Sequence, residues 1–395
     1  MSAAQVVVIG AGPGGLAAAA ALGARGVQAL VVDRDSQVGS SWRRHYERLH
    51  LHTPRRWSGL PGYPIPRRFG RWVARADVVR YLEEYVEHHG ILLRLGTAVT
   101  RIERASTAAS HRNGATAGDS TASDSVTNAR WLVHLDDGPP LAAEHVIVAT
   151  GYNHTPVTPD WPGLDGFTGD LVLARDYRNG RPYAGRDVLV VGTGNTGTEI
   201  ATDLAEHGAT RVWLAVRTPP HIIRRDMLGW PAQGTGILVR RLPPRLVDRV
   251  AHGLAAVQEP DLSAYGMPRA DPGLYSRVLV GRVPVQDVGI VDAIRTRRVE
   301  PVAAVESVDG AEVVLTDGTR LRPDAVLVAA GYRAGLEPLV GDLGVLDGRG
   351  LPVVHGAHEP PGAPGLWFTG FTNPISGMLR ELRIDAERIA AAIAR

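Results

Sequence analysis

Two glycine-rich turns constrain the fold of this 395-residue chain more than any other feature. The apolar run 6–9 leads into the first turn, and an alanine-rich segment reaching about Arg25 follows. The same order recurs where residues 187–191 lead into a second turn and a helical segment to about His207. A buried strand, a glycine turn and a helix form the phosphate-binding start of a βαβ unit. The turn residues are Gly10, Gly12, Pro13, Gly14 and Gly15 in the first unit, and Gly192, Gly194, Asn195, Thr196 and Gly197 in the second.

The residue after the second strand of each unit indicates which nucleotide the unit binds. Asp33 follows the expected strand 29–32, and a carboxylate there can bind ribose hydroxyls. Arg217 follows the expected strand 212–216, and a guanidinium suits the 2′-phosphate of NADPH better than NADH. Arg224 can add positive charge nearby. Two such units imply two dinucleotides held close together, the arrangement that passes a hydride between them.

The composition excludes several kinds of chemistry. The chain has no cysteine, and all 43 of its basic residues are arginine. Disulfide-exchanging flavoenzymes need a cysteine pair and Schiff-base enzymes need a lysine, so both classes are excluded. The basic residues are scattered and the net charge is only +2, which argues against nucleic-acid binding. The 14 histidines show no metal-ligand spacing, so no metal is expected.

The apolar runs of the chain are too short to span a bilayer, and its first residues lead into a strand instead of a signal-peptide core. We therefore expect no transmembrane segment and a cytoplasmic location.

Over nearly its whole length the chain resembles the class B flavoprotein monooxygenases, and among them the flavin-containing and YUCCA-type enzymes. Besides the two glycine turns, several short segments carry this resemblance. They are Gly39-Ser40-Ser41-Trp42, residues 46–54, Ala149-Thr150-Gly151, residues 215–219 with His221, residues 225–229 and residues 284–289. The resemblance implies FAD in the first unit and NADPH in the second. Further cofactor-binding residues are then expected at Arg34, Trp42, His52, Thr150, Gly151, Gly370 and Phe371.

A family fingerprint of the form FxGxxxHxxxY falls on Phe167, Gly169, Leu173 and Tyr177. Leu173 stands where the family has histidine, and the fingerprint is associated with domain motion during the cycle. The related Baeyer–Villiger monooxygenases close the fingerprint with Trp, so Tyr177 favours the heteroatom-oxidising or YUCCA-like branch. Thr53 stands about where many heteroatom-oxidising members carry an active-site asparagine.

The resemblance also implies the reaction. NADPH reduces FAD, O2 adds at the flavin C4a carbon, and the resulting C4a-hydroperoxyflavin transfers one oxygen atom to a small-molecule substrate. An amine or thioether fits the family, and an α-keto acid fits its YUCCA-like members. We expect few catalytic side chains because the flavin carries the chemistry. The polar residues to test first are Arg43, Thr53, Arg282 and Asp287.

Two alternatives remain open from the residues alone. An electron-transfer reductase or NADPH oxidase would use two dinucleotide domains equally well. Such an enzyme would not need the fingerprint histidine that Leu173 replaces. A flavin-binding regulatory subunit is the other alternative, against which the intact glycine motifs argue.

The expected fold is α/β, with two doubly wound, Rossmann-type domains and the NADPH domain inserted into the FAD domain. The FAD domain comprises residues 1–155 and 330–395, with a polar surface loop at about 106–129. The NADPH domain comprises residues 156–329, with a partly helical excursion at about 224–285.

Overall fold

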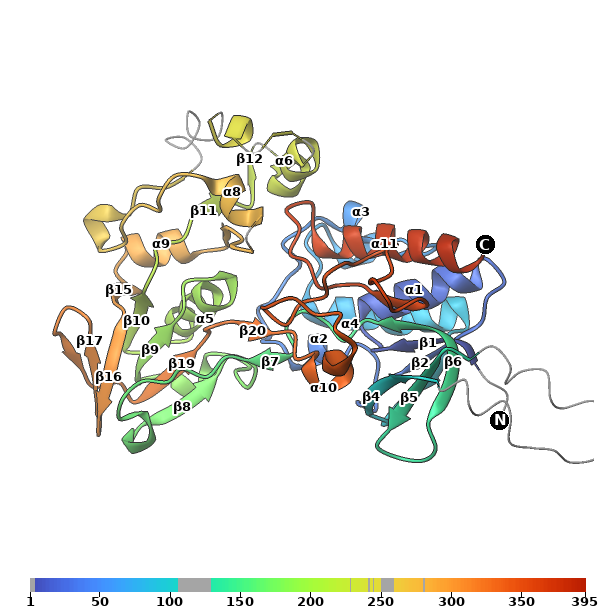
Figure 1. Cartoon of the computed structure of the whole chain (residues 1–395). Coiled ribbons are helices and arrows are strands. Elements are labelled where there is room, and N and C mark those ends of the chain that lie inside the picture. The colour runs from blue at the N-terminus through green and yellow to red at the C-terminus, as the bar shows by residue number, and fades with distance from the viewer. Residues whose placement is uncertain are drawn as a thin grey trace, which may run out of the picture.

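Two separate β-sheets form the two halves of the protein, as Figure 1 shows. The structure is a computed structural model that describes residues 4–105, 129–227, 229–240, 242–243, 245–249, 259–279 and 281–395. The loop expected at about 106–129 lies outside the described residues apart from its last position, and so does part of the expected excursion.

The first sheet has the strand order β3-β2-β1-β6-β5-β4, with β21 also paired to β6. Its strands are β1 (Ala4–Ile9), β2 (Ala29–Val32), β3 (Leu92–Arg94), β4 (Val99–Arg104), β5 (Trp131–Leu135), β6 (Leu141–Val148) and β21 (Leu366–Phe368). Strands β3, β2, β1, β6 and β21 run parallel to one another, whereas β5 pairs antiparallel with both β6 and β4. Strands β4 and β5, which lie on the two sides of the polar loop in the sequence, thus pair with one another.

Three long helices cover the first sheet: α1 (Pro13–Gly23), α4 (Arg75–His89) and α11 (Met378–Ile393). Helix α1 is apolar almost all round because it lies between the sheet and α11, and its leucines are fully buried. Helix α11 closes this core with Leu382, Ala386 and Ile389. The shorter helices of this half are α2 (Ser40–Arg44), α3 (Arg55–Ser58), η1 (Arg67–Phe69), α10 (Glu337–Val340) and η6 (Gly341–Leu343).

The second sheet has the order β15-β10-β9-β19-β8, and every pairing in it is parallel. Helix α5 (Asn195–Glu206) and helix α9 (Ile290–Arg295) contact one another beside this sheet. A three-stranded antiparallel sheet, β16-β17-β18, adjoins it. The remaining bounds in this half are β8 (Asp170–Leu173), β9 (Asp187–Val191), β10 (Arg211–Val216), β15 (Glu300–Ala303), β16 (Val305–Asp309), β17 (Glu312–Leu315), β18 (Arg320–Leu321), β19 (Ala325–Val328), η3 (Leu164–Gly166) and η4 (Arg181–Tyr183).

The excursion leaves and rejoins the second half at a parallel pair, β11 (Ile222–Arg224) with β14 (Val285–Asp287). Its described elements are short, and they lie above the second sheet in Figure 1. They are β12 (Asp226–Met227), β13 (Trp230–Pro231), α6 (Ala232–Val239), η5 (Ser263–Tyr265) and α8 (Leu274–Leu279).

The chain crosses between the halves on two short strands, β7 (Thr155–Pro156) and β20 (Tyr332–Arg333), which pair antiparallel. All five strands of the second sheet lie between these two crossings in the sequence. The predicted α/β fold with two Rossmann-type units is therefore confirmed. No described helix combines the length and the apolar character that a membrane span requires.

Candidate active site

The first glycine turn joins β1 to α1, and its glycines meet different requirements. Gly10 has a φ of +110°, and a Cβ built on it would lie 2.5 Å from the carbonyl oxygen of Ala149. A Cβ at Gly15 would overlap the carbonyl oxygen of Gly10. Gly12 caps α1, and nothing lies within 4 Å of a Cβ built there. Its missing side chain opens the helix N-terminus to an anion, as binding of a pyrophosphate requires.

The second glycine turn repeats this construction between β9 and α5. Gly192 has a φ of +116°, and a Cβ on it would overlap the carbonyl oxygen of Ala329. A Cβ at Gly197 would overlap the carbonyl oxygen of Gly192. Gly194 caps α5, and a Cβ built on it would again meet nothing within 4 Å. Both turns therefore fit the pyrophosphate of a dinucleotide.

The residues that follow the second strands differ between the two halves. Asp33 accepts hydrogen bonds from the backbone N–H groups of Ala11 at 2.6 Å and Asp35 at 2.8 Å. Burial raises the pKa of Asp33, and this effect is larger than the lowering by those hydrogen bonds. Arg217 follows β10 and its side chain is exposed. A carboxylate thus contacts the first turn, and an exposed guanidinium lies near the second.

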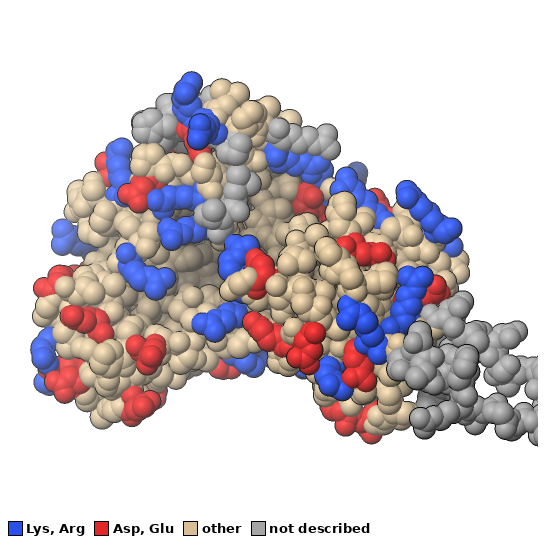
Figure 2. Space-filling view, in the orientation of Figure 1, with Lys and Arg blue, Asp and Glu red and all other residues tan. Residues whose placement is uncertain are grey.

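A cavity of about 1170 Å³ lies between the two halves, which Figure 2 shows as a recess with arginines near its rim. The first half contributes the first glycine turn, the segment 149–154 and the segment 369–382. The second half contributes Asn195 and parts of the excursion, including Arg224. The cavity exceeds the size of common small-molecule pockets and can hold reacting rings from both nucleotides with a substrate.

Comparisons with known proteins decide the family. Residues 3–337 match the flavin-binding monooxygenase-like family. The chain belongs to this family.

The relatives include the rice (Oryza sativa subsp. japonica) indole-3-pyruvate monooxygenase YUCCA1, which is 36% identical over 93% of this chain and 86% of its own length. The probable indole-3-pyruvate monooxygenase YUCCA9 of Arabidopsis thaliana is 32% identical over 98% of this chain and 88% of its own. A flavin-containing monooxygenase from Stenotrophomonas maltophilia shares the fold, with a TM-score of 0.70 and 24% identity over 99% of both chains.

This flavin-binding monooxygenase is therefore an oxidoreductase that uses FAD and NADPH, as the resemblance implied. The electron-transfer reductase and oxidase alternative is not favoured. The two glycine turns, built alike on separate sheets, agree with a need for two dinucleotides.

Many of the residues predicted from the sequence line the cavity. Those on its wall are Gly10, Gly12, Pro13, Gly14, Asp33, Arg34, Trp42, His52, Thr53, Thr150, Gly151, Asn195, Arg224 and Gly370. The other predicted residues lie away from the described wall: Gly15, Gly192, Gly194, Thr196, Gly197, Arg217 and Phe371, with Arg43, Arg282 and Asp287.

Three of the four residues suggested as catalytic lie away from the described cavity wall. Arg43 forms an ion pair with Glu83 at 2.5 Å. Asp287 accepts a hydrogen bond from the backbone of Gly289 at 3.0 Å, just before α9. Arg282 is exposed. The first contact joins α2 to α4, the second lies in the turn before α9, and among the four only Thr53 lies on the described cavity wall.

Asn195 connects the second glycine turn to the cavity. Its side-chain oxygen accepts a hydrogen bond from the backbone N–H of Gln286 at 2.8 Å, and its amide donates to the carbonyl of Pro284 at 3.2 Å. Both partners line the cavity. Asn195 therefore holds the segment that includes β14 against the start of α5.

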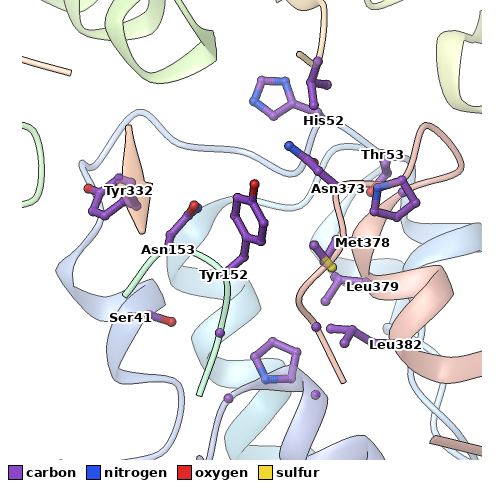
Figure 3. Close-up of a pocket in the computed structure, with 18 of the residues that line it drawn as sticks. Ser41, His52, Thr53, Tyr152, Asn153, Tyr332, Asn373, Met378, Leu379 and Leu382 are labelled. Carbon is purple, nitrogen blue, oxygen red and sulfur yellow. The ribbon is translucent and has the colours of Figure 1, made fainter. Parts of the chain in front are cut away.

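Several polar residues of the cavity escaped the sequence reasoning. Figure 3 shows Tyr152 and Asn373 pointing toward the side of the cavity where His52 lies, with Asn153 and Tyr332 nearby. Tyr152 and Asn153 could have been predicted from their position, because they directly follow the predicted Thr150-Gly151 pair. Asn373 likewise lies two residues after the predicted Gly370-Phe371 pair.

The family fingerprint begins just before β8, runs along this strand and ends in the turn that follows it. The hydroxyl of Tyr177 donates a hydrogen bond to the buried carboxylate of Asp203 on α5 at 2.6 Å. Burial, followed by this carboxylate, raises the pKa of Tyr177 far above its usual value. Leu173, at the histidine position, packs in the apolar cluster beside the second sheet. The fingerprint tyrosine is thus hydrogen-bonded to the helix that begins at the second glycine turn.

His45 lies on the cavity wall, and its titration makes the stability of the protein depend on pH. Burial, and then the charges of Arg75 and Arg178, lower its pKa from 6.5 to about 4. Between these two values the unfolded chain binds more protons, so stability falls as the pH falls below 6.5. We expect His45 to contribute a loss of about 2 kcal/mol in the free energy of unfolding between pH 7.5 and pH 5.

Urea unfolding of the wild-type protein and of His45→Gln at both pH values tests this expectation. The variant should lose about 2 kcal/mol less than the wild type on acidification, because other groups titrate equally in both proteins. An equal loss in the two proteins would show that His45 is not held neutral by the fold.

Proposed function

We propose that this monooxygenase oxidises an aromatic 2-oxo acid. The reaction consumes the 2-oxo acid, O2, NADPH and H⁺, and it yields the carboxylic acid shorter by one carbon, CO2, NADP⁺ and water. Support comes from the relatives, which are named for indole-3-pyruvate. The chemistry of a 2-oxo acid suits oxygen transfer, because its ketone carbon is electrophilic and CO2 is a stable leaving group.

The observation that carries the proposal is the apolar character of one side of the cavity. Ile223, Met227, Trp230 and Val239 of the excursion lie on its wall. The segment leading into α11 adds further apolar residues, of which Met378, Leu379 and Leu382 appear in Figure 3. An aromatic side chain gains about 1.5–3 kcal/mol when such a surface takes it out of water.

We further propose that each half binds one of the two cofactors. Residues 1–155 and 330–395 bind FAD through the first glycine turn and Asp33. Residues 156–329 bind NADPH through the second glycine turn, with Arg217 and Arg224 near the 2′-phosphate. The bound cofactors supply the hydride and the redox centre. The chain orients them and keeps water from the reacting atoms through the apolar wall.

Incubation with ¹⁸O2, NADPH and a series of candidate substrates tests this function. Indole-3-pyruvate and phenylpyruvate should each give the shortened acid with one ¹⁸O atom and nearly one NADPH consumed per product. Pyruvate lacks the ring, so its kcat/KM should be at least about tenfold lower.

A matched thioether and a tertiary amine serve as comparison substrates in the same assay. Labelled sulfoxide or N-oxide, with no labelled acid from any 2-oxo acid, would refute the substrate proposal and leave the monooxygenase activity intact. Hydrogen peroxide as the sole oxygen product with every substrate would support the oxidase alternative instead.

A further inference from the structure

A buried carboxylate on the second half contacts the cavity wall of the first half. Glu199 lies on α5, two residues after Gly197, and is only 3% exposed. Its Oε1 atom lies 2.9 Å from Nε2 of His52. Figure 3 shows His52 at the edge of the cavity, which its side chain helps to line. The contact therefore joins the helix that starts at the second glycine turn to the space where the reactants meet.

Two further ionisable groups, one from each half, lie close to Glu199. Tyr46 from the first half is buried beside it, and burial, followed by the charge of Glu199, raises the pKa of Tyr46. Arg225 from the second half is largely buried as well. Burial lowers its pKa to about 10, and Glu199 opposes that shift. Glu199 thus shares its buried surroundings with a phenol and a guanidinium, and a cation and hydrogen-bond donors offset the cost of burying a carboxylate.

His52 has one ring nitrogen that this contact does not use. Its Nδ1 atom is buried and has no hydrogen-bond partner among the described residues. The Nε2 contact is short, but it is not aligned as a linear hydrogen bond. Catalytic hydrogen bonds are often poorly aligned before the reactants bind and tighten afterwards. A buried ring nitrogen without a partner costs free energy unless a ligand satisfies it.

We propose that Glu199 is a positioning residue that holds the His52 ring with its proton on Nε2, so that Nδ1 accepts a hydrogen bond from a donor group of a bound cofactor. A carboxylate can only accept, so it selects the tautomer with the proton on Nε2. The other nitrogen of a neutral ring is then an acceptor. A dinucleotide seated at the second glycine turn thereby influences the ring through α5. The inference rests on the FAD and NADPH chemistry and not on the 2-oxo acid.

The tautomer of His52 is the first test, and it requires no turnover. The FAD-loaded enzyme is labelled with ¹⁵N-histidine, and the His52 signals are identified by their loss in His52→Gln. We expect protonation at Nε2 in the wild type. In Glu199→Gln we expect a mixture of tautomers, because an amide both donates and accepts. A wild-type ring protonated at Nδ1, or an unchanged tautomer in Glu199→Gln, would overturn the proposal.

Glu206→Gln is the matched control. Glu206 also lies on α5, and it also forms an ion pair with the first half, through Arg48. Its side chain is 41% exposed and lies away from the described cavity wall. This variant should leave the His52 tautomer unchanged. A change of tautomer in Glu206→Gln as large as that in Glu199→Gln would mean that any loosening between the halves disturbs the ring, which would overturn the specific role of Glu199.

Anaerobic reduction of bound FAD by saturating NADPH is the second test, and it needs no substrate. Glu199→Gln and His52→Gln should each slow reduction by about 10- to 100-fold, the range known for partners that orient metal-ligating side chains. The affinity for NADPH should change little, and Glu206→Gln should reduce within about twofold of the wild type.

The double variant separates positioning from a merely structural role. Glu199→Gln/His52→Gln should reduce no more slowly than His52→Gln alone, because both changes act through one ring. Multiplied effects would overturn the proposal. If Glu199→Gln purifies without FAD, Glu199→Met replaces it, since an apolar residue of similar size removes the buried charge without loss of packing. Failure of the 2-oxo acid assay would leave all these readouts intact.

Discussion

A Gly12→Val variant is expected to fold and to purify without FAD. Gly12 has a φ of −84°, which valine can adopt, and a Cβ there meets no protein atom within 4 Å. The added side chain instead occupies the approach to the N-terminus of α1, which the FAD pyrophosphate needs. The loss should be at least about 100-fold in FAD affinity, or about 2.7 kcal/mol. Flavin absorbance per protein and the thermal unfolding of the apoprotein measure the two expectations.

Gly194→Val is the matched variant at the second turn. Gly194 has a φ of −79° and the same open surroundings, but it caps α5. This variant should retain FAD while its Kd for NADPH rises by about 100-fold. Each variant thus controls for the other. Loss of FAD from Gly194→Val with NADPH binding intact would show that the two nucleotides occupy the opposite turns.

Arg217→Ala is expected to weaken NADPH selectively. The exposed guanidinium follows β10, the strand next to the one that leads into the second glycine turn. A charge-assisted contact to a phosphate contributes about 1.5–3 kcal/mol, or about 10- to 150-fold in affinity. NADH lacks the 2′-phosphate. The apparent KM for NADPH should therefore rise at least about tenfold, and that for NADH should change little in steady-state assays.

Arg224 is the residue most able to compensate for the loss of Arg217. It is exposed and lies on the cavity wall. Arg225 is a poorer candidate, because its guanidinium stacks on Trp72 at 4.0 Å and donates to the carbonyl of Leu51. The double variant Arg217→Ala/Arg224→Ala should therefore abolish the preference for NADPH. A wild-type preference in both variants would refute our placement of the 2′-phosphate.

The two nucleotide-binding units were predictable because their signals are local. A glycine turn lies within one strand, one turn and one helix, so neighbours in the sequence are also neighbours in space. The overlap that a Cβ would create at Gly15 or Gly197 involves the start of its own turn. The parallel strands beside each turn were equally predictable, because buried parallel strands appear in a sequence as apolar runs.

The choice of catalytic side chains was less predictable. Segments that resemble a family indicate where the chain passes near the cavity, but not which side chains point into it. Arg43 and Thr53 both belong to the segments around α2 and α3, yet the first pairs with Glu83 and the second lines the cavity. Side-chain direction depends on packing between distant elements, which a local pattern does not contain.

Local patterns in the chain were enough to predict the fold class, the two dinucleotide turns and the family. The set of residues around the cavity, and the contact of Glu199 with His52 across the two halves, depend instead on the packing of distant elements. These two residues are 147 positions apart, and each belongs to a segment with its own local explanation. Their contact exists because two separate sheets are packed together, which brings residues that are distant in the sequence to one interface.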